Sequence, residues 1–344
     1  MGTEALRQPA EWSPHDAVWL AWPSHEALWG AALPEVRRSF TAFARAITRD
    51  GGERLEVLCP DAAQEALARA ALDGLPARFH RIPFGDIWLR DTAPVFMHDA
   101  AGAVVAALFA FNGWGGKYEL AHDTEVSARV AAAAGCRVVT HDFAMEGGSV
   151  EVDGEGTALS SRQCLLNPNR NPAMDEAAVT RAVLGAFGAE RLLWVTDGLL
   201  NDHTDGHIDT IARFVAPGVV ALMEPSGADD PNREVLRALR DELAGQRDAR
   251  GRALELVFAP SPGRVEDGGG RVMPASHLNF YIGNRAVVVP TYRTAFDDAA
   301  GRAAEAMFPG RRVEVVDALP ILRGGGAFHC ISQQQPSRRH GAGR

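Results

Sequence analysis

Four short stretches of the chain bring acidic, imidazole or thiol side chains together with glycine or tryptophan. They are DIWLRDTAP (86–94), MEGGSVEVDGEG (145–156), NDHTDGHIDTIARF (201–214) and GGGAFHC (324–330). An ionised thiol is a nucleophile, an imidazole can carry protons, and a carboxylate can hold either a cation or the imidazole. One site built from all four stretches would therefore combine a nucleophile with a proton carrier and anionic binding groups.

Cys330 is the candidate nucleophile among the four cysteines. It follows three glycines and His329, whereas Cys59, Cys136 and Cys164 lie in apolar runs, where cysteine usually acts as a small buried hydrophobe. No CxxC pair occurs, so neither a zinc ribbon nor a thioredoxin-type motif is present. The thiol of Cys330 would need a positive or proton-accepting group nearby to react.

The stretch 201–214 supplies the candidate proton carrier. On a helix, His203 and His207 would share one face, as metal ligands need. Gly206 and the strand-like IDTIARFV favour extended chain instead, in which His207 and Asp209 point the same way. We therefore expect a general base at His207 beside a substrate-binding carboxylate at Asp209.

Asp91 and Glu146 are the other two candidate acids. Asp91 shares its segment with Trp88, and a rigid carboxylate beside an aromatic ring suits a planar cation. Glu146 precedes two glycines, which permit close approach of the backbone, although a hairpin turn fits this stretch equally well. These residue types allow attack of sulfur on a guanidinium, with Glu146 orienting His207, but do not require it.

Apolar runs of strand length recur along the chain and must hold these residues in place. Apolar residues at helical spacing lie between the runs, over 34–48, over 174–188 and after Asn232, a candidate N-cap. The pattern predicts an α/β fold with many strands. The predicted strands are 55–60, 104–111, 136–143, 191–198, 253–260, 286–293 and 312–319.

The turns that carry chemistry are almost evenly spaced. Asp91, Glu146, His207, Asp267 and Cys330 follow one another at steps of 55, 61, 60 and 63 residues. A nearly constant step predicts a repeated supersecondary unit, in which each unit delivers one loop to a common centre.

The composition is typical of a globular protein and argues against several function classes. The chain has 344 residues, of which 46% are hydrophobic and 23% charged. The net charge of −9, without a basic stripe, argues against a nucleic-acid partner and is compatible with a cationic ligand. No signal-peptide pattern occurs, and no apolar run approaches the ~18 residues that cross a membrane. We expect a cytoplasmic protein without membrane contact.

Ordered motifs along nearly the whole chain resemble the agmatine deiminase family, which is related to the bacterial type of peptidylarginine deiminase. The chain departs from the family pattern at Ala93, where glycine is usual, and in a short loop after WGG. The motifs are EWSPHDAVWLAWP (11–23), DIWLRDTAP (86–94), FNGWGGKY (111–118), EGGSVEVDGEGTALSSRQCLLNPNRNP (146–172), TDGHIDTIARF (204–214), PASHLNFYIGN (274–284) and GGGAFHCISQQQP (324–336).

The resemblance implies a fold and an activity. The expected fold is a five-bladed α/β-propeller of repeated ββαβ units (pentein-type), forming a single catalytic domain over 1–336 with a polar tail over 337–344. The expected reaction is hydrolysis of the guanidinium of agmatine to N-carbamoylputrescine and ammonia, as in putrescine and polyamine biosynthesis. No metal or organic cofactor is expected, and a homodimer is compatible with the sequence.

The resemblance also implies a role for each matched residue. Cys330 is the expected nucleophile, His207 the general acid/base, and Glu146 the acid that holds the imidazole. Asp91 and Asp209 are the expected carboxylates for the guanidinium. Three further residues of matched segments are expected to line the pocket: Trp88, Trp114 and His277.

Two alternatives stay open at this point. One keeps the fold and changes the substrate, as in a peptidylarginine deiminase or another guanidine hydrolase. The other is a zinc-binding or scaffolding protein that would use His203, His207, His329 and Cys330.

Overall fold

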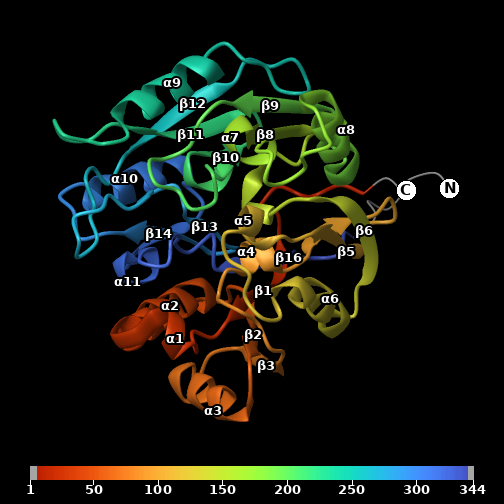
Figure 1. Ribbon diagram of the computed structural model, residues 1–344, viewed down its shortest axis with the longest axis vertical. Helices are drawn as coiled ribbons and strands as arrows, with labels where there is room; N and C mark the ends of the chain where they lie inside the picture. The colour runs from red at the N-terminus through yellow and green to blue at the C-terminus, as the bar shows by residue number, and fades with distance from the viewer. Residues whose placement is uncertain (1–5, 340–344) are drawn as a thin grey trace.

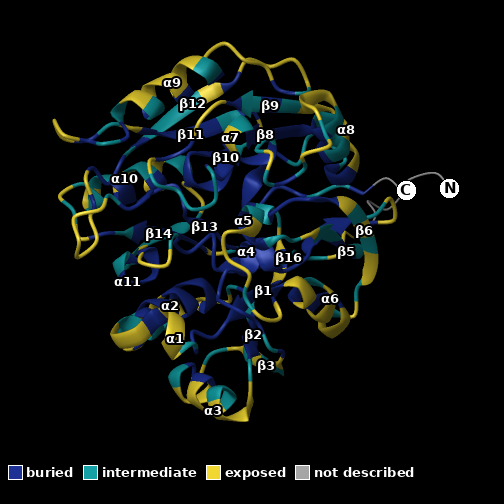
Figure 2. Ribbon diagram, in the orientation of Figure 1, coloured by how far each residue is buried: buried dark blue, intermediate teal, exposed yellow. Residues whose placement is uncertain are grey.

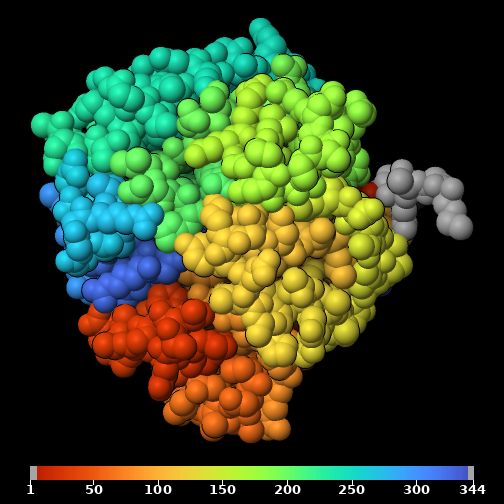
Figure 3. Space-filling view, viewed as in Figure 1, coloured from red at the N-terminus to blue at the C-terminus, as the bar shows by residue number. Residues whose placement is uncertain are grey.

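Five small β-sheets surround a common centre in a computed structural model, which describes residues 6–339. Successive stretches of the chain occupy successive sectors around this centre (Figures 1 and 3). The longer helices lie outside the ring of sheets, and the short helix α4 (Leu89–Thr92) lies near its middle (Figure 1). This arrangement gives each sector a way to send one loop to the centre.

Four of the sheets repeat one three-stranded topology. The first strand pairs antiparallel with the second, and the second pairs parallel with the third. Because parallel neighbours need a long crossover connection, a helix joins the second strand to the third. The repeated unit is therefore ββαβ. Its strands are β4 (Val95–His98), β5 (Val104–Ala110) and β6 (Arg137–Ala144); β7 (Val150–Val152), β8 (Thr157–Ser161) and β9 (Arg191–Val195); β10 (Ala212–Ala216), β11 (Val219–Glu224) and β12 (Glu255–Pro260); β13 (Tyr281–Ile282), β14 (Ala286–Thr291) and β15 (Arg312–Asp317). The crossover helices are α6 (Asp123–Ala134), α8 (Glu176–Phe187), α9 (Arg233–Leu243) and α10 (Asp297–Met307).

The fifth sheet closes the ring with both ends of the chain. β16 (Ser332–Pro336) pairs antiparallel with β1 (His15–Ala21), which pairs parallel with β2 (Arg54–Cys59). A further strand, β3 (Ala77–Arg81), extends this sheet at its edge. The helices of this sector are α2 (Leu33–Thr48) and α3 (Ala62–Ala71). The closure confirms the predicted five-bladed propeller of ββαβ units.

The remaining helices are short. They are α1 (Glu26–Trp29), α4, α5 (Gly113–Gly116), α7 (Arg162–Leu165) and α11 (Leu319–Leu322), together with 3₁₀ turns at Gly30–Ala32, Gly147–Ser149 and Ile208–Thr210. No helix within residues 6–339 has both the length and the apolar character needed to cross a membrane.

Burial follows the sequence patterns that predicted the elements (Figure 2). Each of the seven predicted runs contains a strand, and the three predicted helices correspond to α2, α8 and α9. On α9, Leu236, Leu239 and Leu243 are buried in one apolar cluster, and each such burial contributes about 1.5–3 kcal/mol. Asn232 precedes α9 as predicted but does not cap it, because its side-chain oxygen accepts a hydrogen bond from Leu200 N at 2.8 Å.

The evenly spaced turns are only partly a structural repeat. Asp267 lies in an exposed turn, where its carboxylate accepts hydrogen bonds from Gly269 N and Arg271 N. The prediction that it reaches the centre is wrong, because the GRVEDGGG segment folds on itself. Asn279, from the start of the last unit, reaches the centre in its place.

The predicted polar tail begins with residues that contact the body of the protein. Ser337 N donates to Pro14 O at 2.8 Å, and Arg339 N donates to Gly102 O at 3.0 Å. The rest of the predicted tail, 340–344, lies outside the described residues.

Candidate active site

Helix α4 presents Asp91 to the centre of the ring. Its Oδ2 accepts a hydrogen bond from the indole N–H of Trp114 at 2.8 Å, and its Oδ1 accepts one from Gly148 N at 3.1 Å. Trp114 reaches the carboxylate from α5, where its φ of 53° lies in the left-handed region. Such a backbone is strained for tryptophan, so the fold holds this indole in place at a cost of about 1–3 kcal/mol.

Glu146 directly precedes the 3₁₀ turn that follows β6, and Gly148 lies within that turn. Glu146 is buried, and its Oε1 accepts a hydrogen bond from the Arg170 guanidinium at 2.8 Å. A Cβ on Gly148 would lie 2.6 Å from His207 Nδ1 and 3.1 Å from carboxylate oxygens of Asp91 and Asp209. Glycine is therefore required here because three polar side chains crowd against the backbone.

His207 points its two ring nitrogens at different acids. Nε2 lies 3.6 Å from Glu146 Oε2, and Nδ1 lies 3.7 Å from Asp91 Oδ1. The predicted extended chain is wrong here, since a 3₁₀ turn at 208–210 follows His207 and β10 begins only at Ala212. The turn, and not strand alternation, brings His207 and Asp209 to the same site.

Cys330 lies at the centre, just before β16. Its sulfur accepts a hydrogen bond from the Asn279 side-chain amide at 3.2 Å and lies 3.7 Å from Asp209 Oδ2. The glycine run explains how the chain reaches this position, because a Cβ on Gly326 would lie 2.9 Å from the sulfur and 2.9 Å from the ring of Trp88. Asn279 belongs to the matched segment PASHLNFYIGN, but the sequence assigned it no role.

A buried ion pair beneath Cys330 fixes one oxygen of Asp209. The ring of His329 lies between Asp209 Oδ2, at 2.7 Å, and Glu11 Oε2, at 2.8 Å. The other oxygen of Asp209, Oδ1, is buried and has no hydrogen-bond partner. Because a buried acceptor without a partner is costly, this oxygen is poised to receive an N–H from a ligand.

A chain of alternating charges leads from the pocket to the imidazole. Lys117, the only lysine in the sequence, lies 2.7 Å from Asp205 Oδ1. Arg170 then links Asp205 Oδ2, at 2.6 Å, to Glu146 Oε1. Glu146 completes the chain at His207. Neither Arg170 nor Lys117 was singled out from the sequence, because their partners lie on separate loops.

A cavity of about 340 Å³ opens beside these groups, within the usual range for small-molecule sites. Its floor includes Asp91 and Cys330, and its walls include Trp88 and Trp114. The substrate-binding role expected of both tryptophans stays a prediction. Apolar and aromatic side chains continue towards the rim. They include Leu28, Trp29, Tyr118 and Leu120.

His277 does not line this cavity. Its Nδ1 contacts Pro260 O at 2.8 Å, and its Nε2 contacts Asp297 Oδ1 at 3.0 Å. The two ring nitrogens of His277 thus connect the end of β12 to the start of helix α10. The expectation that His277 lines the pocket is wrong, because the matched segment turns its imidazole away from the centre.

The electrostatics keep the sulfur protonated and the imidazole charged in the free protein. Burial, with Asp209 and Asp91 nearby, raises the pKa of Cys330 well above its usual value. For His207, burial acts to lower the pKa, but Asp91, Cys164 and Glu146 outweigh it and raise the pKa well above its usual value. The two groups therefore rest as a thiol and an imidazolium.

The three acids of the site differ in the direction of their pKa shifts: the pKa of Asp91 is raised, whereas those of Glu146 and Asp209 are lowered. Burial raises the pKa of Asp91 to about 6, against the opposing effect of His207. Burial acts in the same direction on Glu146, but His207 and Arg170 outweigh it, so its pKa is lowered. Burial also acts to raise the pKa of Asp209, but His329, His207 and Arg213 together outweigh it, so this pKa is lowered as well.

The four residues of the zinc alternative do not form one cluster. His329 is held between two carboxylates, and His203 lies at the rim, where Tyr118 Oη contacts its Nδ1 at 3.1 Å. Within residues 6–339, no group of three potential metal ligands contains His203 or Cys330. That set is therefore wrong as a metal site.

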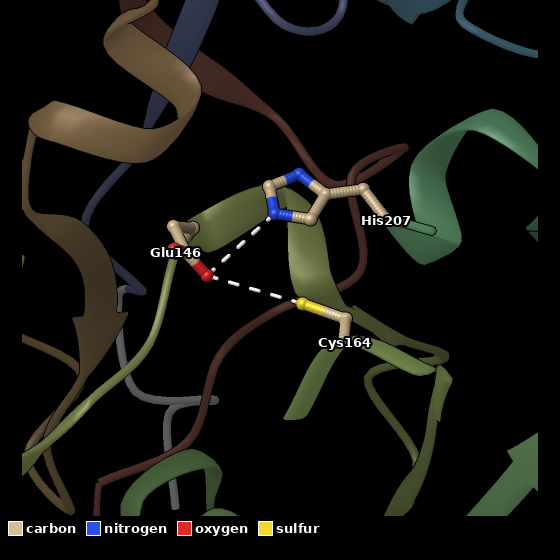
Figure 4. Close-up of side chains that lie close together, drawn as sticks. All are labelled: Glu146, Cys164 and His207. Atoms are coloured by element: carbon tan, nitrogen blue, oxygen red, sulfur yellow. Dashed lines mark hydrogen bonds and ion pairs between the residues drawn. The ribbon is translucent and has the colours of Figure 1, made fainter. Parts of the chain in front are cut away.

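Cys164 lies in the apolar core, as expected, and it also lies close to the site. It is fully buried, and its sulfur lies 4.0 Å from Glu146 Oε2, the same oxygen that His207 Nε2 faces (Figure 4). Burial raises the pKa of its thiol. Cys59 is buried as expected, and Cys136 is half-buried.

Substituting Gly148 tests whether these groups form one working site. In Gly148→Ala, the new Cβ would push against His207, Asp91 and Asp209, so we expect kcat/KM to fall by at least about 100-fold. The matched control is Gly185→Ala, because helix α8 leaves open space at Gly185. Alanine there should raise stability by up to about 1 kcal/mol without changing the kinetics. Unchanged kinetics in Gly148→Ala would contradict this geometry.

Comparison with known families gives a match across most of the chain. Residues 7–336 match the model of the Porphyromonas-type peptidyl-arginine deiminase family. A curated protein named agmatine deiminase from Pseudomonas aeruginosa (strain LESB58) is 36% identical over 359 residues, covering 98% of this chain and 97% of its own length.

Solved structures show the same architecture. The agmatine deiminase of Enterococcus faecalis superposes with a TM-score of 0.93 at 29% identity, covering 98% of this chain and 99% of that one. The DDAH of Pseudomonas aeruginosa superposes with a TM-score of 0.55 at 12% identity, covering 93% of this chain and 99% of that one. The second likeness concerns the fold alone.

Proposed function

The chain belongs to the Porphyromonas-type peptidyl-arginine deiminase family, and from this we propose that it is an agmatine deiminase. It hydrolyses the guanidinium of agmatine to N-carbamoylputrescine and ammonia, as a hydrolase of C–N bonds in linear amidines. The single observation that carries the proposal is the position of Cys330, 3.7 Å from the buried carboxylate of Asp209 and on the floor of the same cavity as Asp91.

Two carboxylates bind the guanidinium in this proposal. Asp209 offers its unpartnered Oδ1, and Asp91 offers a carboxylate held rigid by Trp114 and Gly148. Paired charge-assisted hydrogen bonds fix the plane of the guanidinium and present its central carbon to the sulfur. The apolar walls of the cavity receive the methylene chain.

Binding of the cation ionises the nucleophile. The carboxylates of Asp209 and Asp91 both disfavour a thiolate at Cys330, and a guanidinium between them offsets their charge. The thiol then loses its proton to solvent, and its sulfur attacks the guanidinium carbon. The free protein thus avoids a reactive thiolate until substrate arrives.

His207 carries the protons of both half-reactions. As an imidazolium it donates a proton to the departing nitrogen, ammonia leaves, and a thiouronium remains on Cys330. The neutral imidazole then takes a proton from water, whose oxygen adds to the same carbon and expels the sulfur. Glu146, held by Arg170, stabilises the charged imidazole in each cycle.

The ionisation step predicts how alkylation of Cys330 depends on pH. In Asp209→Asn, one carboxylate that raises the pKa of Cys330 is neutralised, so the thiolate should form at lower pH. We expect the midpoint of iodoacetamide labelling, followed on the Cys330 peptide by mass spectrometry, to move to lower pH. A midpoint that stays or rises would contradict the proposed charge coupling. Labelling of Cys136, which is half-buried elsewhere, serves as the internal reference.

A substrate panel tests the assignment directly. Purified protein would be given agmatine, arginine, peptidyl-arginine and methylated arginines, with ammonia and ureido products measured. Agmatine should give the highest kcat/KM. Preference for peptidyl-arginine by tenfold or more would identify another guanidine hydrolase, and no turnover of any guanidine would reject the proposal.

A further inference from the structure

A second thiol lies at the proton-carrying end of the site and has no part in the reaction. Cys164 Sγ and His207 Nε2 lie 4.0 Å and 3.6 Å from the same atom, Glu146 Oε2 (Figure 4). The three potential ligand atoms all lie within 4.8 Å of one another. We propose that Glu146, Cys164 and His207 form a binding site for Zn²⁺ or a similar borderline-soft divalent cation, and that metal bound there inhibits the enzyme.

The donor set and its spacing suit zinc. Thiolate, imidazole and carboxylate are the three classes of zinc ligand in proteins, with bonds of about 2.0–2.3 Å. Ligand atoms on a tetrahedral ion with such bonds lie about 3.3–3.8 Å apart. The two separations from Glu146 Oε2 therefore need to shrink by only a few tenths of an ångström for Cys164 and less for His207. The separation between Cys164 Sγ and His207 Nε2 is at most 4.8 Å.

The unpartnered ring nitrogen Nε2 of His207 is an independent sign of a ligand. This nitrogen is buried and has no hydrogen-bond partner, although it faces Glu146 Oε2. Glu146 is free to bind through that oxygen, because the Arg170 side chain uses the other one. Three protein ligands leave a fourth position for water, as in open zinc sites.

The surrounding charges tolerate a divalent cation. Arg170 lies beside Glu146, but it is also paired with Asp205, at 2.6 Å. Asp91 adds a further carboxylate 3.7 Å from the opposite nitrogen of His207. On binding, a metal–sulfur bond replaces the S–H bond of Cys164, a metal–nitrogen bond replaces the Nε2–H bond of His207, and both protons leave to solvent.

The other cluster of potential ligands fits a metal less well. It consists of Glu11, Glu151 and His329. The guanidinium of Arg213 already lies 2.6 Å from Glu11 and 3.1 Å from Glu151, so a positive group occupies the space between these acids. In the Cys164 cluster, the Arg170 guanidinium binds the other oxygen of Glu146, Oε1, and leaves Oε2 for a metal.

Metal at this site would stop proton transfer. With Nε2 coordinated, His207 is no longer stabilised as an imidazolium by Glu146, so it cannot protonate the departing nitrogen. The inhibitory consequence rests on the proposed function, whereas binding of the metal does not. The two are therefore tested separately.

Binding is tested with Co²⁺ on full-length Cys330→Ala, which leaves Cys164 as the only thiol near the cluster. We expect one Co²⁺ per chain and an intense thiolate-to-metal absorption band in the near ultraviolet. The band should vanish in Cys330→Ala/Cys164→Ser and persist in the matched control Cys330→Ala/Cys136→Ser. Absence of the band in Cys330→Ala, or its persistence without Cys164, would overturn the proposal.

X-ray absorption at the zinc edge identifies the atoms bound to the metal and does not require a substitution of Cys164. In Cys330→Ala loaded with one Zn²⁺, we expect one sulfur ligand at about 2.3 Å and two or three nitrogen or oxygen ligands. A shell without sulfur would reject the site even if the Cys164 variants fail to fold.

Inhibition is tested by measuring the rate of ammonia release with and without zinc. The rate of each protein with zinc is divided by the rate of the same protein without zinc. In the unsubstituted protein, zinc should lower the rate of ammonia release by at least about tenfold, as expected when the metal occupies nearly every site. The rate should recover when a chelator removes the zinc. In Cys164→Ser, the same zinc concentration should lower the rate of ammonia release by less than twofold. Equal inhibition of both proteins would refute the inhibitory site. No turnover of agmatine before zinc is added would refute the proposed function and leave the cobalt result standing.

Discussion

Replacing Cys330 with alanine is expected to reduce ammonia release from agmatine by at least about 10⁴-fold, because no other group supplies the nucleophile. The sulfur is buried beside Asp209 and Asn279, and its removal leaves the surrounding ion pairs intact. Circular dichroism and the melting temperature should therefore remain close to those of the unsubstituted protein. The measurement is initial-rate ammonia release over a range of agmatine concentrations.

Cys136→Ala is the matched control for this loss. Cys136 is half-buried, and the nearest polar contact of its sulfur is the carbonyl oxygen of Ala134 at 3.8 Å. Its substitution should leave kcat and KM unchanged within about twofold. Turnover in Cys330→Ala within tenfold of the unsubstituted protein would remove Cys330 from the mechanism.

The second large effect is expected at the two carboxylates that bind the guanidinium. Asp91→Asn and Asp209→Asn should each lower kcat/KM by about 100- to 1,000-fold, since losing one partner of a buried charge pair costs about 2–5 kcal/mol. Both carboxylates are buried, so water does not screen the loss. Steady-state kinetics with agmatine and calorimetric binding to a Cys330→Ser background measure the effect.

Asp267→Asn provides the matched control for the carboxylates. Asp267 is exposed, and its side chain accepts two backbone hydrogen bonds that asparagine also accepts. Its substitution should leave activity and binding unchanged. If Asp91→Asn and Asp209→Asn behaved like this control, neither carboxylate would bind the substrate.

Local sequence patterns were enough to predict the architecture. The Val- and Leu-rich runs mark strands such as β2 and β14 because each is buried on both faces and bounded by turn residues. The regular spacing of Asp91, Glu146, His207 and Cys330 reflects the loop that each ββαβ unit sends to the centre. The same spacing misplaced Asp267, because spacing cannot distinguish a loop that turns inward from one that folds on itself.

The contacts within the site were harder to predict. Glu11 and His329 are 318 residues apart, and their contact exists only because the ring closes between β1 and β16. Asn279 lies in a matched segment, but only the folded chain aims its amide at the sulfur of Cys330. Cys164 is a core residue as predicted, but its apolar sequence neighbours could not indicate that Glu146 approaches it from another turn.

The His207–Asp209 pair shows how a correct pairing can follow from a wrong local structure. Strand alternation predicted that both side chains point the same way, and both do lie near Gly148. The cause is a 3₁₀ turn, which the short side chain of Thr210 favours by donating from Oγ1 to His207 O at 2.9 Å. Patterns of period two cannot predict such a turn.

The most direct test of the central claim is to trap the covalent intermediate. In His207→Gln, Cys330 can still attack and ammonia can still leave slowly by taking its proton from solvent, but activation of water is lost, so reaction with agmatine should leave an adduct on the protein. Mass spectrometry of the digested protein should show the Cys330 peptide heavier by the mass of agmatine less one ammonia. The account would be contradicted by an adduct on another residue, or by ammonia release at an undiminished rate with no adduct detected.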